Sequence, residues 1–153
     1  MRTKALNSMA DYCSKAEHCT DDVRKRLAKF DLTNEERNDI VEWLTKERFI
    51  DDCRYAKLYA REKARFNGWG PQKIRFQLIH KHISNDIINE ALAELTPEVS
   101  SDRLCSMLAN KARSIKDDDP WKRRNKLIRF GLSRGFDYDT VLKSLPEDIA
   151  SED

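Results

Sequence analysis

Hydrophobic residues recur at steps of three and four along almost the whole chain. Leu6, Met9 and Cys13 form one such stripe, and Val23 and Leu27 belong to the next. This spacing places the apolar side chains on one face of an α-helix. The 153 residues include only 4 Gly and 4 Pro, which is too few for the frequent turns of an all-β fold. The pattern therefore predicts an all-α protein.

Helix start signals agree with this periodicity. The segment Thr33–Glu36 has the spacing of a capping box and predicts a helix from about Asn34. Asp51 and Ser84 are suitable caps for two further helices. Proline in the first helical turn leaves no hydrogen bond unmade, because its missing N–H would lack a partner there. Proline follows a suitable cap at three places: Gly70–Pro71, Thr96–Pro97 and Asp119–Pro120.

These signals divide the chain into similar thirds. Each third is expected to hold a long first helix, a basic second helix and a shorter third helix, with a period near 45 to 50 residues. We predict an elongated array of three tandem three-helix units, and the alternative is a single bundle of eight or nine helices. Units this small are marginal as independent folds, so neighbouring units should support one another. The predicted units are residues 4–50, 51–95 and 96–146, followed by an acidic tail at 147–153.

Residue chemistry argues against an enzyme. The sequence has no Gly-rich phosphate loop, no G-x-S-x-G elbow and no H-E-x-x-H motif. Cys13, His18 and Cys19 suggest a metal site, but no second ligand pair with zinc spacing accompanies them, so we favour structural cysteines. We expect no catalytic residue, no cofactor and no metal. No stretch approaches the roughly 20 apolar residues that span a bilayer, which favours a cytoplasmic protein without membrane contact.

Charge is strongly segregated along a chain whose formal net charge is only +2. Residues 53–83 contain eight basic residues against Glu62 alone, and residues 111–134 contain nine basic residues against three aspartates. Four acidic residues and no basic residue follow Pro146. A basic row can simply be a solvated helix face. Two basic blocks, each built around a proline-started helix, instead favour an anionic partner such as single- or double-stranded DNA.

The segment RFNGWGPQKIR interrupts the helical pattern in the first of these blocks. Gly68 and Gly70 permit backbone angles that other residues resist, and Pro71 starts a new helix. We interpret the segment as a structural corner with a charged outer surface. Trp69 is expected either to plug the core between two helices or to form an exposed stacking platform, and burial is favoured.

Three motifs around this corner resemble the central signature of the RecX family. They are F-I-D-D-x-R-Y-A at Phe49–Ala56, R-x-x-x-G-W-G-P-Q-K-I-R-F-Q-L at Arg65–Leu78, and K-H-I-S-N-D-I-I at Lys81–Ile88. The flanks, residues 5–30 and 126–145, are similar to the first and last units of that family. The resemblance implies an all-helical modulator that binds in the groove of the RecA–DNA filament, and we expect the protein to be a monomer. It implies restraint of strand exchange, ATP hydrolysis and repressor cleavage.

The basic blocks and the resemblance together give a set of candidate partner-binding residues on the second and third units. The set is Lys57, Arg61, Lys63, Arg65, Trp69, Lys73, Arg75, Lys81, Lys122, Arg123, Arg124 and Arg129. Two alternatives stay open. One is direct DNA binding through helix-turn-helix-like units, although the third helices are acidic or neutral. The other is a protein scaffold whose basic faces only solvate it.

Overall fold

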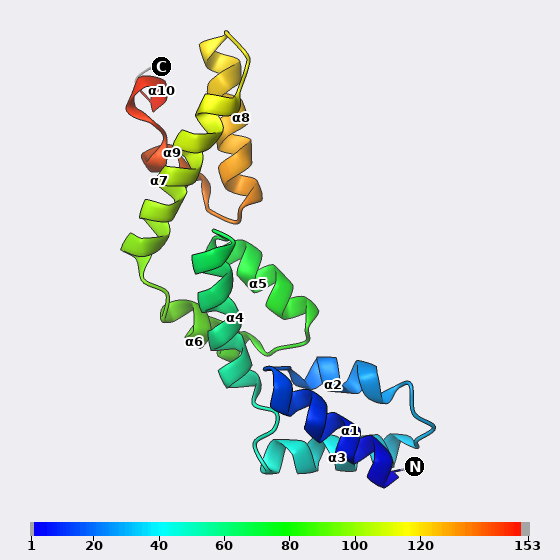
Figure 1. The fold of residues 1–153 in the computed structure, drawn as a ribbon. Coiled ribbons are helices and arrows are strands. Elements are labelled where there is room, and N and C mark those ends of the chain that lie inside the picture. Colours follow the sequence, from blue (N-terminus) through cyan, green and yellow to red (C-terminus); the bar gives the residue numbers. More distant parts are fainter. Residues whose placement is uncertain (1, 151–153) are drawn as a thin grey trace.

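The computed structural model describes residues 2–150, which form ten α-helices and contain no strand. The helices follow one another in three groups along the chain (Figure 1), so the prediction of an all-α protein is confirmed. Their bounds are α1 Arg2–Lys15, α2 Thr20–Leu27, α3 Asn34–Lys46, α4 Asp52–Phe66, α5 Pro71–His80, α6 Asn85–Ala93, α7 Pro97–Ser114, α8 Pro120–Ser133, α9 Tyr138–Ser144 and α10 Glu147–Ala150.

The predicted side-chain caps at Thr33, Asp51, Ser84 and Asp119 are present, whereas Thr96 precedes α7 without a side-chain cap hydrogen bond. The Thr33 hydroxyl accepts a hydrogen bond from the backbone N–H of Glu36, and the Glu36 carboxylate accepts one from the Thr33 N–H. The Asp51 carboxylate accepts from the Arg54 N–H, and the Ser84 hydroxyl caps α6. Helices α5, α7 and α8 all begin at a proline. A capping side chain or a first-turn proline therefore marks where α3 to α8 begin, and these local signals are why the sequence pattern located the boundaries.

Each group of helices surrounds its own hydrophobic core. One core lies among α1, α2 and α3, a second among α4, α5 and α6, and a third among α7 to α10. Two residues cross the predicted unit boundaries. Cys19, just before α2, packs into the second core. Ile149, which is 2% exposed, packs into the third core from the segment predicted as an acidic tail. Residues 147–150 of that segment form α10, and residues 151–153 lie outside the described residues.

Helix lengths differ among the groups. In the first group α1 has 14 residues, α2 has 8 and α3 has 13, so the third helix is only slightly shorter than the first and is longer than the second. In the second and third groups the helices shorten along the chain as expected.

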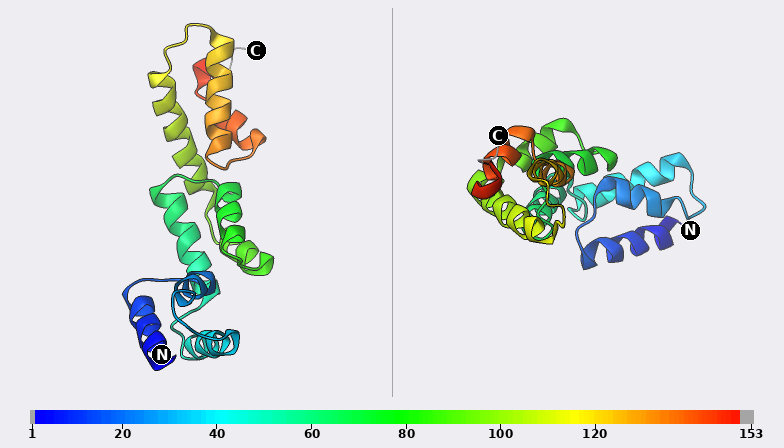
Figure 2. Two further views of the ribbon diagram at one scale, coloured as in Figure 1. Left: turned by 90° about the vertical axis from the view of Figure 1, so that its right-hand side faces the viewer. Right: turned by 90° about the horizontal axis from the view of Figure 1, so that it is seen from above.

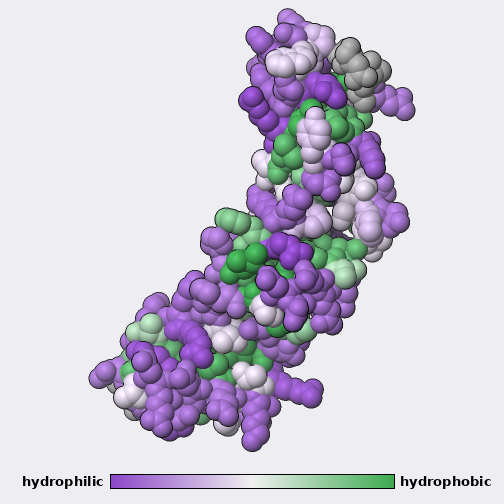
Figure 3. All heavy atoms as spheres, turned by 180° about the vertical axis from the view of Figure 1, so that it is seen from behind, coloured by the Kyte–Doolittle hydropathy of each residue, from purple (hydrophilic) through white to green (hydrophobic). Residues whose placement is uncertain are grey.

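The described chain is elongated, and its two ends lie at opposite ends of the molecule (Figures 1 and 2). The face drawn in Figure 3 is mainly hydrophilic, with hydrophobic residues visible in limited areas. Within residues 2–150, no helix is both long enough and apolar enough to cross a membrane. This shape presents a large, mainly hydrophilic surface to any extended partner.

The first and second units meet through buried and charged groups. Lys81 donates a hydrogen bond of 2.9 Å to the Asp22 carboxylate, and the Thr20 N–H donates one of 2.8 Å to Asp52. The ring of His82 lies 2.8 Å from the carboxylate of Asp21. Cys19 inserts between these contacts into the second core. The start of α2 is thus fixed on the middle unit.

The second and third units meet backbone to backbone at the α4–α5 corner. The Gly70 N–H donates to the Arg134 carbonyl at 2.6 Å, and the Gln72 N–H donates to the Gly135 carbonyl at 3.0 Å. A Cβ atom at Gly70 would lie 2.8 Å from Cγ of Phe136 and even closer to the Gly135 carbonyl. The corner predicted from sequence is real, but its backbone is a joint between units and not an outer surface.

Candidate partner-binding surfaces

Helix α4 carries a row of basic residues at four-residue spacing. Arg61 and Arg65 are exposed and form no salt bridge with the described part of the chain. Lys57, one turn earlier, is tied to Glu90 at 3.2 Å and to Glu94 at 3.3 Å, and these hydrogen bonds raise its pKa. Only the last two members of the predicted row are therefore free cations.

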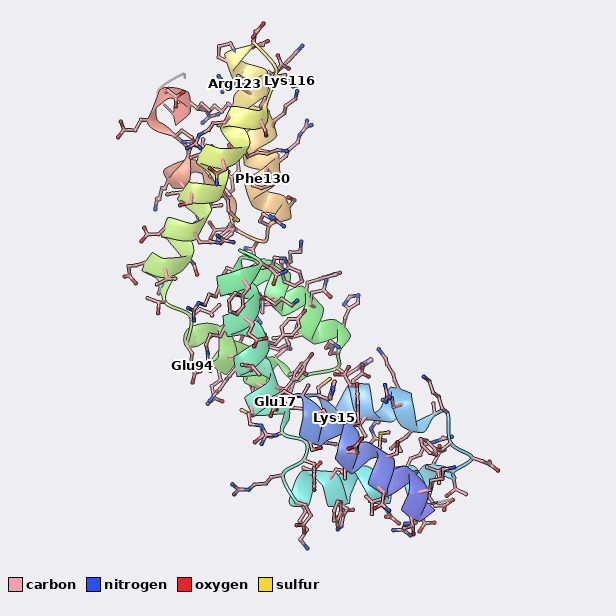
Figure 4. All side chains as sticks on the ribbon, viewed as in Figure 1. Lys15, Glu17, Glu94, Lys116, Arg123 and Phe130 are labelled. Carbon is pink, nitrogen blue, oxygen red and sulfur yellow. The ribbon has the colours of Figure 1, made fainter. Side chains whose placement is uncertain are left out.

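A groove with a volume of about 670 Å³ runs beside this row, between α4, the end of α6 and the start of α7. We refer to it as the α4–α7 groove. Figure 4 shows Glu94 at the end of α6, beside the connection to α7. Its basic wall is formed by Arg61 and Arg65. Its apolar floor is formed by Ala64, Ala91, Leu95 and Val99.

Trp69 at the corner combines the two roles that the sequence left open. Its ring packs against the second core and lies edge-on to Tyr59, with 6.4 Å between ring centroids. The ammonium groups of Lys63 and Lys73 approach it at 5.0 Å and 4.8 Å from the centroid. A partly buried indole held between two cations is anchored by packing and cation–π attraction. Its remaining surface, flanked by positive charge, is open to a partner.

The remaining basic candidates on the middle unit differ in exposure and in whether they are already paired with a carboxylate. Arg75 is half-buried on α5. Burial alone would lower the pKa of Lys81, but its hydrogen bond to Asp22 raises that pKa above the ordinary value. Lys81 therefore serves the joint between the first and second units. As a cation already paired with a carboxylate, it is a poor candidate for contacting a second anion.

In the third unit, the exposed members of the predicted set are Lys122 and Arg129. Arg123 is half-buried and donates a hydrogen bond of 3.2 Å to the Ala112 carbonyl at the end of α7. Arg124 is half-buried, and its Nε atom lacks a hydrogen-bond partner. Arg123 and Arg124 thus contribute to the packing of α8, and α8 offers fewer free cations than its sequence suggested.

A second groove, with a volume of about 630 Å³, lies between the end of α7 and α8. We refer to it as the α7–α8 groove. Figure 4 shows Lys116 in the loop at the tip of this unit and Phe130 further along α8. Three of its four basic residues were missed as individual candidates, although they belong to the basic block at 111–134. The groove is lined by Lys111, Lys116, Lys126 and Arg129 together with Ile115 and Phe130.

The cysteines do not assemble into a site. Cys13 lies in the first core and Cys19 in the second, and burial raises the pKa of both thiols, that of Cys19 to about 11. Residues 2–150 contain no group of three His, Cys, Asp or Glu side chains placed to hold a metal ion. His18 instead stacks on Tyr12, with ring centroids 3.7 Å apart. Cys13 and Cys19 therefore behave as small core residues, whereas Cys53 is half-buried and Cys105 is exposed.

Comparison with known protein families identifies the two units that carry these grooves. Residues 51–92 match the model of the RecX second three-helix domain, and residues 98–145 match that of the RecX third three-helix domain. The chain belongs to the RecX family. A regulatory protein RecX from Prosthecochloris aestuarii is 31% identical over 144 residues, which cover 94% of this chain and 93% of the relative.

Other RecX relatives are longer than this chain. A regulatory protein RecX from Clostridium botulinum (strain Eklund 17B / Type B) is 32% identical over 114 residues, covering 73% of this chain but only 53% of the relative. One from Limosilactobacillus reuteri is 30% identical over 152 residues, covering 99% of this chain and 57% of the relative. The chain thus spans a little over half the length of these two relatives.

Solved RecX structures share the fold. The crystal structure of a regulatory protein RecX superposes with a TM-score of 0.84 at 28% identity, covering 91% of this chain and 68% of that chain. The crystal structure of RecX from Lactobacillus salivarius gives the same TM-score at 24% identity and covers 94% and 93% of the two chains. The helical array seen in Figures 1 and 2 is therefore a RecX fold.

Proposed function

We propose that this RecX-family chain is a non-enzymatic regulator that binds the RecA–DNA filament in the cytoplasm and restrains its recombinase, ATPase and repressor-cleavage activities. The observation that carries the proposal is that both family-matched units bear outward-facing free cations. Arg61 and Arg65 lie on the second unit, and Lys111, Lys116 and Arg129 lie on the third. A filament of protein and nucleic acid offers anionic surfaces at repeated intervals, which an elongated array can contact at several points.

The electrostatic pattern fits this role better than it fits catalysis. Cations spread over two units increase the rate of encounter with an anionic filament, since long-range attraction steers association. An extended molecule that contacts several filament subunits opposes the rearrangements that strand exchange and nucleotide hydrolysis require. Regulation then follows from binding alone, and no chemical step on this chain is needed.

ATP hydrolysis by RecA on single-stranded DNA tests the proposal, with this protein titrated in at substoichiometric levels. Binding to naked DNA is measured in parallel at the same salt concentration. We expect hydrolysis to fall at protein concentrations that leave naked DNA mostly unbound. If hydrolysis changes only when the protein coats the DNA, the protein competes for the strand and the filament proposal is wrong.

Direct action on DNA is the second candidate function, because the three-helix units also suit helix-turn-helix-like binding. It is favoured by the α7–α8 groove, whose cations surround the half-buried aromatic ring of Phe130. Against it, α6 contains Asp86 and Glu90 and no basic residue, unlike a helix that reads bases in a groove. Preference for a specific duplex by about 10³ or more over other sequences would establish this function.

A further inference from the structure

The α4–α7 groove has a chemical character that differs from the α7–α8 groove. Its floor is formed by Ala64 on α4, Ala91 on α6, Leu95 in the connection between α6 and α7, and Val99 on α7. Val99 is 62% exposed, although it is a large aliphatic residue. Apolar surface gathered in a concave site, and not scattered singly, is typical of surfaces that bind another molecule.

The charged rim of this groove is asymmetric. Arg61 and Arg65 stand one helical turn apart on α4, exposed and without a carboxylate partner in residues 2–150. At the other end of the row, Glu90 and Glu94 already neutralise Lys57. The two unpaired guanidinium groups complement carboxylates on a ligand. The apolar floor beside them complements aliphatic side chains next to those carboxylates.

Nucleic acid fits this combination poorly. A phosphate backbone gains nothing from an aliphatic floor, and this floor contains no aromatic ring on which a base can stack. By contrast, the α7–α8 groove offers Phe130 among four basic side chains. An amphipathic helix places its aliphatic residues at three- and four-residue spacing along one face, which suits an apolar groove between helices.

We propose that the α4–α7 groove is a docking site for an acidic, amphipathic peptide segment of a protein partner. Aliphatic side chains of that segment pack on Leu95 and Val99, while its carboxylates pair with Arg61 and Arg65. Arginine suits this task because its planar fork can donate two parallel hydrogen bonds to one carboxylate. The site lies where the second unit meets α7, and the proposal stands whether or not the partner is the RecA filament.

A fluorescein-labelled peptide tests the site without any knowledge of the natural partner. The probe has roughly 14 residues, about four helical turns, with Leu on one face and Glu on the other. A second probe replaces every Glu with Lys. Fluorescence anisotropy with the full chain should show that the acidic probe binds at least about tenfold more tightly than the basic probe, since each carboxylate–guanidinium contact adds affinity.

Single-residue variants measure the contributions of the charged wall and of the apolar floor separately. Arg61→Glu and Arg65→Glu should each weaken binding of the acidic probe by about fivefold to tenfold, while Arg61→Lys retains most of it. Val99→Ser, which changes no charge, should weaken binding by about threefold through loss of apolar contact. Arg113→Glu is the matched control, since Arg113 is exposed on α7 and does not line the groove. It should leave affinity unchanged.

Two results would overturn the proposal. One is equal affinity for the acidic and basic probes. The other is displacement of the acidic probe by a dT oligomer at lower concentration than the unlabelled peptide requires, which would make the groove a phosphate site. Because the altered residues are exposed, circular dichroism of each variant should match that of the unaltered chain. The outcome of this assay is independent of RecA hydrolysis, so the two proposals can fail separately.

Discussion

At the scale of single residues, the Asp22–Lys81 pair joins the first and second units through residues that lie 59 positions apart in the sequence. The Lys81 ammonium group and the Asp22 carboxylate are 2.9 Å apart, with side chains only 29% and 16% exposed. Asp22 also accepts a hydrogen bond of 3.3 Å from the Cys19 N–H at the start of α2. The pair therefore fixes the orientation of α2 against the turn after α5.

Replacing Lys81 with Met should lower the free energy of unfolding by about 1–2 kcal/mol, because Asp22 would keep its burial and lose its charged partner. Urea unfolding measures the change. Lys15→Met is the matched control: Lys15 pairs with Asp11 one helical turn away at 3.0 Å, and both side chains are mostly exposed, at 75% and 65%. Surface pairs of that kind contribute roughly 0.3–0.5 kcal/mol. Equal losses in the two variants would contradict the assigned role of Lys81.

The same pair predicts an acid-sensitive term in stability. Burial would raise the pKa of Asp22, but the hydrogen bond from Lys81 lowers it below its ordinary value of 3.8. A carboxyl whose pKa is lower in the folded state stabilises the protein above its unfolded-state pKa and loses that contribution as pH falls through the folded value. Unfolding curves between pH 6 and pH 3 should therefore lose less stability in Lys81→Met than in the unaltered chain.

At the scale of elements, the turn between α4 and α5 packs against the turn between α8 and α9. Gly70 has an ordinary φ of −82°, so its role is steric and does not depend on backbone freedom. The backbone of Gly135, at a φ of +96°, passes directly over the place where a Gly70 side chain would project. Close approach of the two turns is what aligns the second unit with the third.

Gly70→Ala should therefore open this joint, because the added methyl group overlaps the carbonyl of Gly135, which is backbone and cannot rotate away. We expect a cost of about 1–3 kcal/mol, together with faster hydrogen exchange at the amides of residue 70 and Gln72, which donate hydrogen bonds across the joint. The exposed neighbour Asn67 provides the control variant Asn67→Ala. Unchanged exchange at both amides in Gly70→Ala would show that the turns do not depend on each other.

The sequence predicts local features of this fold better than contacts between units. Caps such as Thr33 and prolines such as Pro71 act within one helical turn, so their effect can be read from neighbouring residues. The Gly70–Gly135 joint depends on residues 65 positions apart and left no periodic signal. A basic row likewise does not reveal which members are paired. Lys57 is neutralised from α6, whereas Arg61 is free.

At the scale of the whole molecule, the formal net charge is only +2, but the charged residues are unevenly distributed over the surface. Free cations lie beside both grooves, whereas acidic residues such as Glu90 and Asp117 neutralise other cations locally. Under the proposed function, long-range attraction to the filament would arise from these patches and not from the total charge. The α7–α8 groove, with its unpaired Lys116 and Arg129, is the patch best suited to phosphate.

That assignment predicts how salt affects DNA binding. Each phosphate contact to single-stranded DNA contributes about 0.7 to the slope of log affinity against log salt concentration. The double variant Lys116→Ala/Arg129→Ala should therefore reduce the slope by about 1.4, measured by anisotropy on a labelled dT oligomer. Arg61→Ala/Arg65→Ala removes the same charge from the α4–α7 groove and should change the slope far less. Equal changes in both variants would mean that DNA phosphates contact both grooves. The assignment of phosphate to the α7–α8 groove alone would then be wrong.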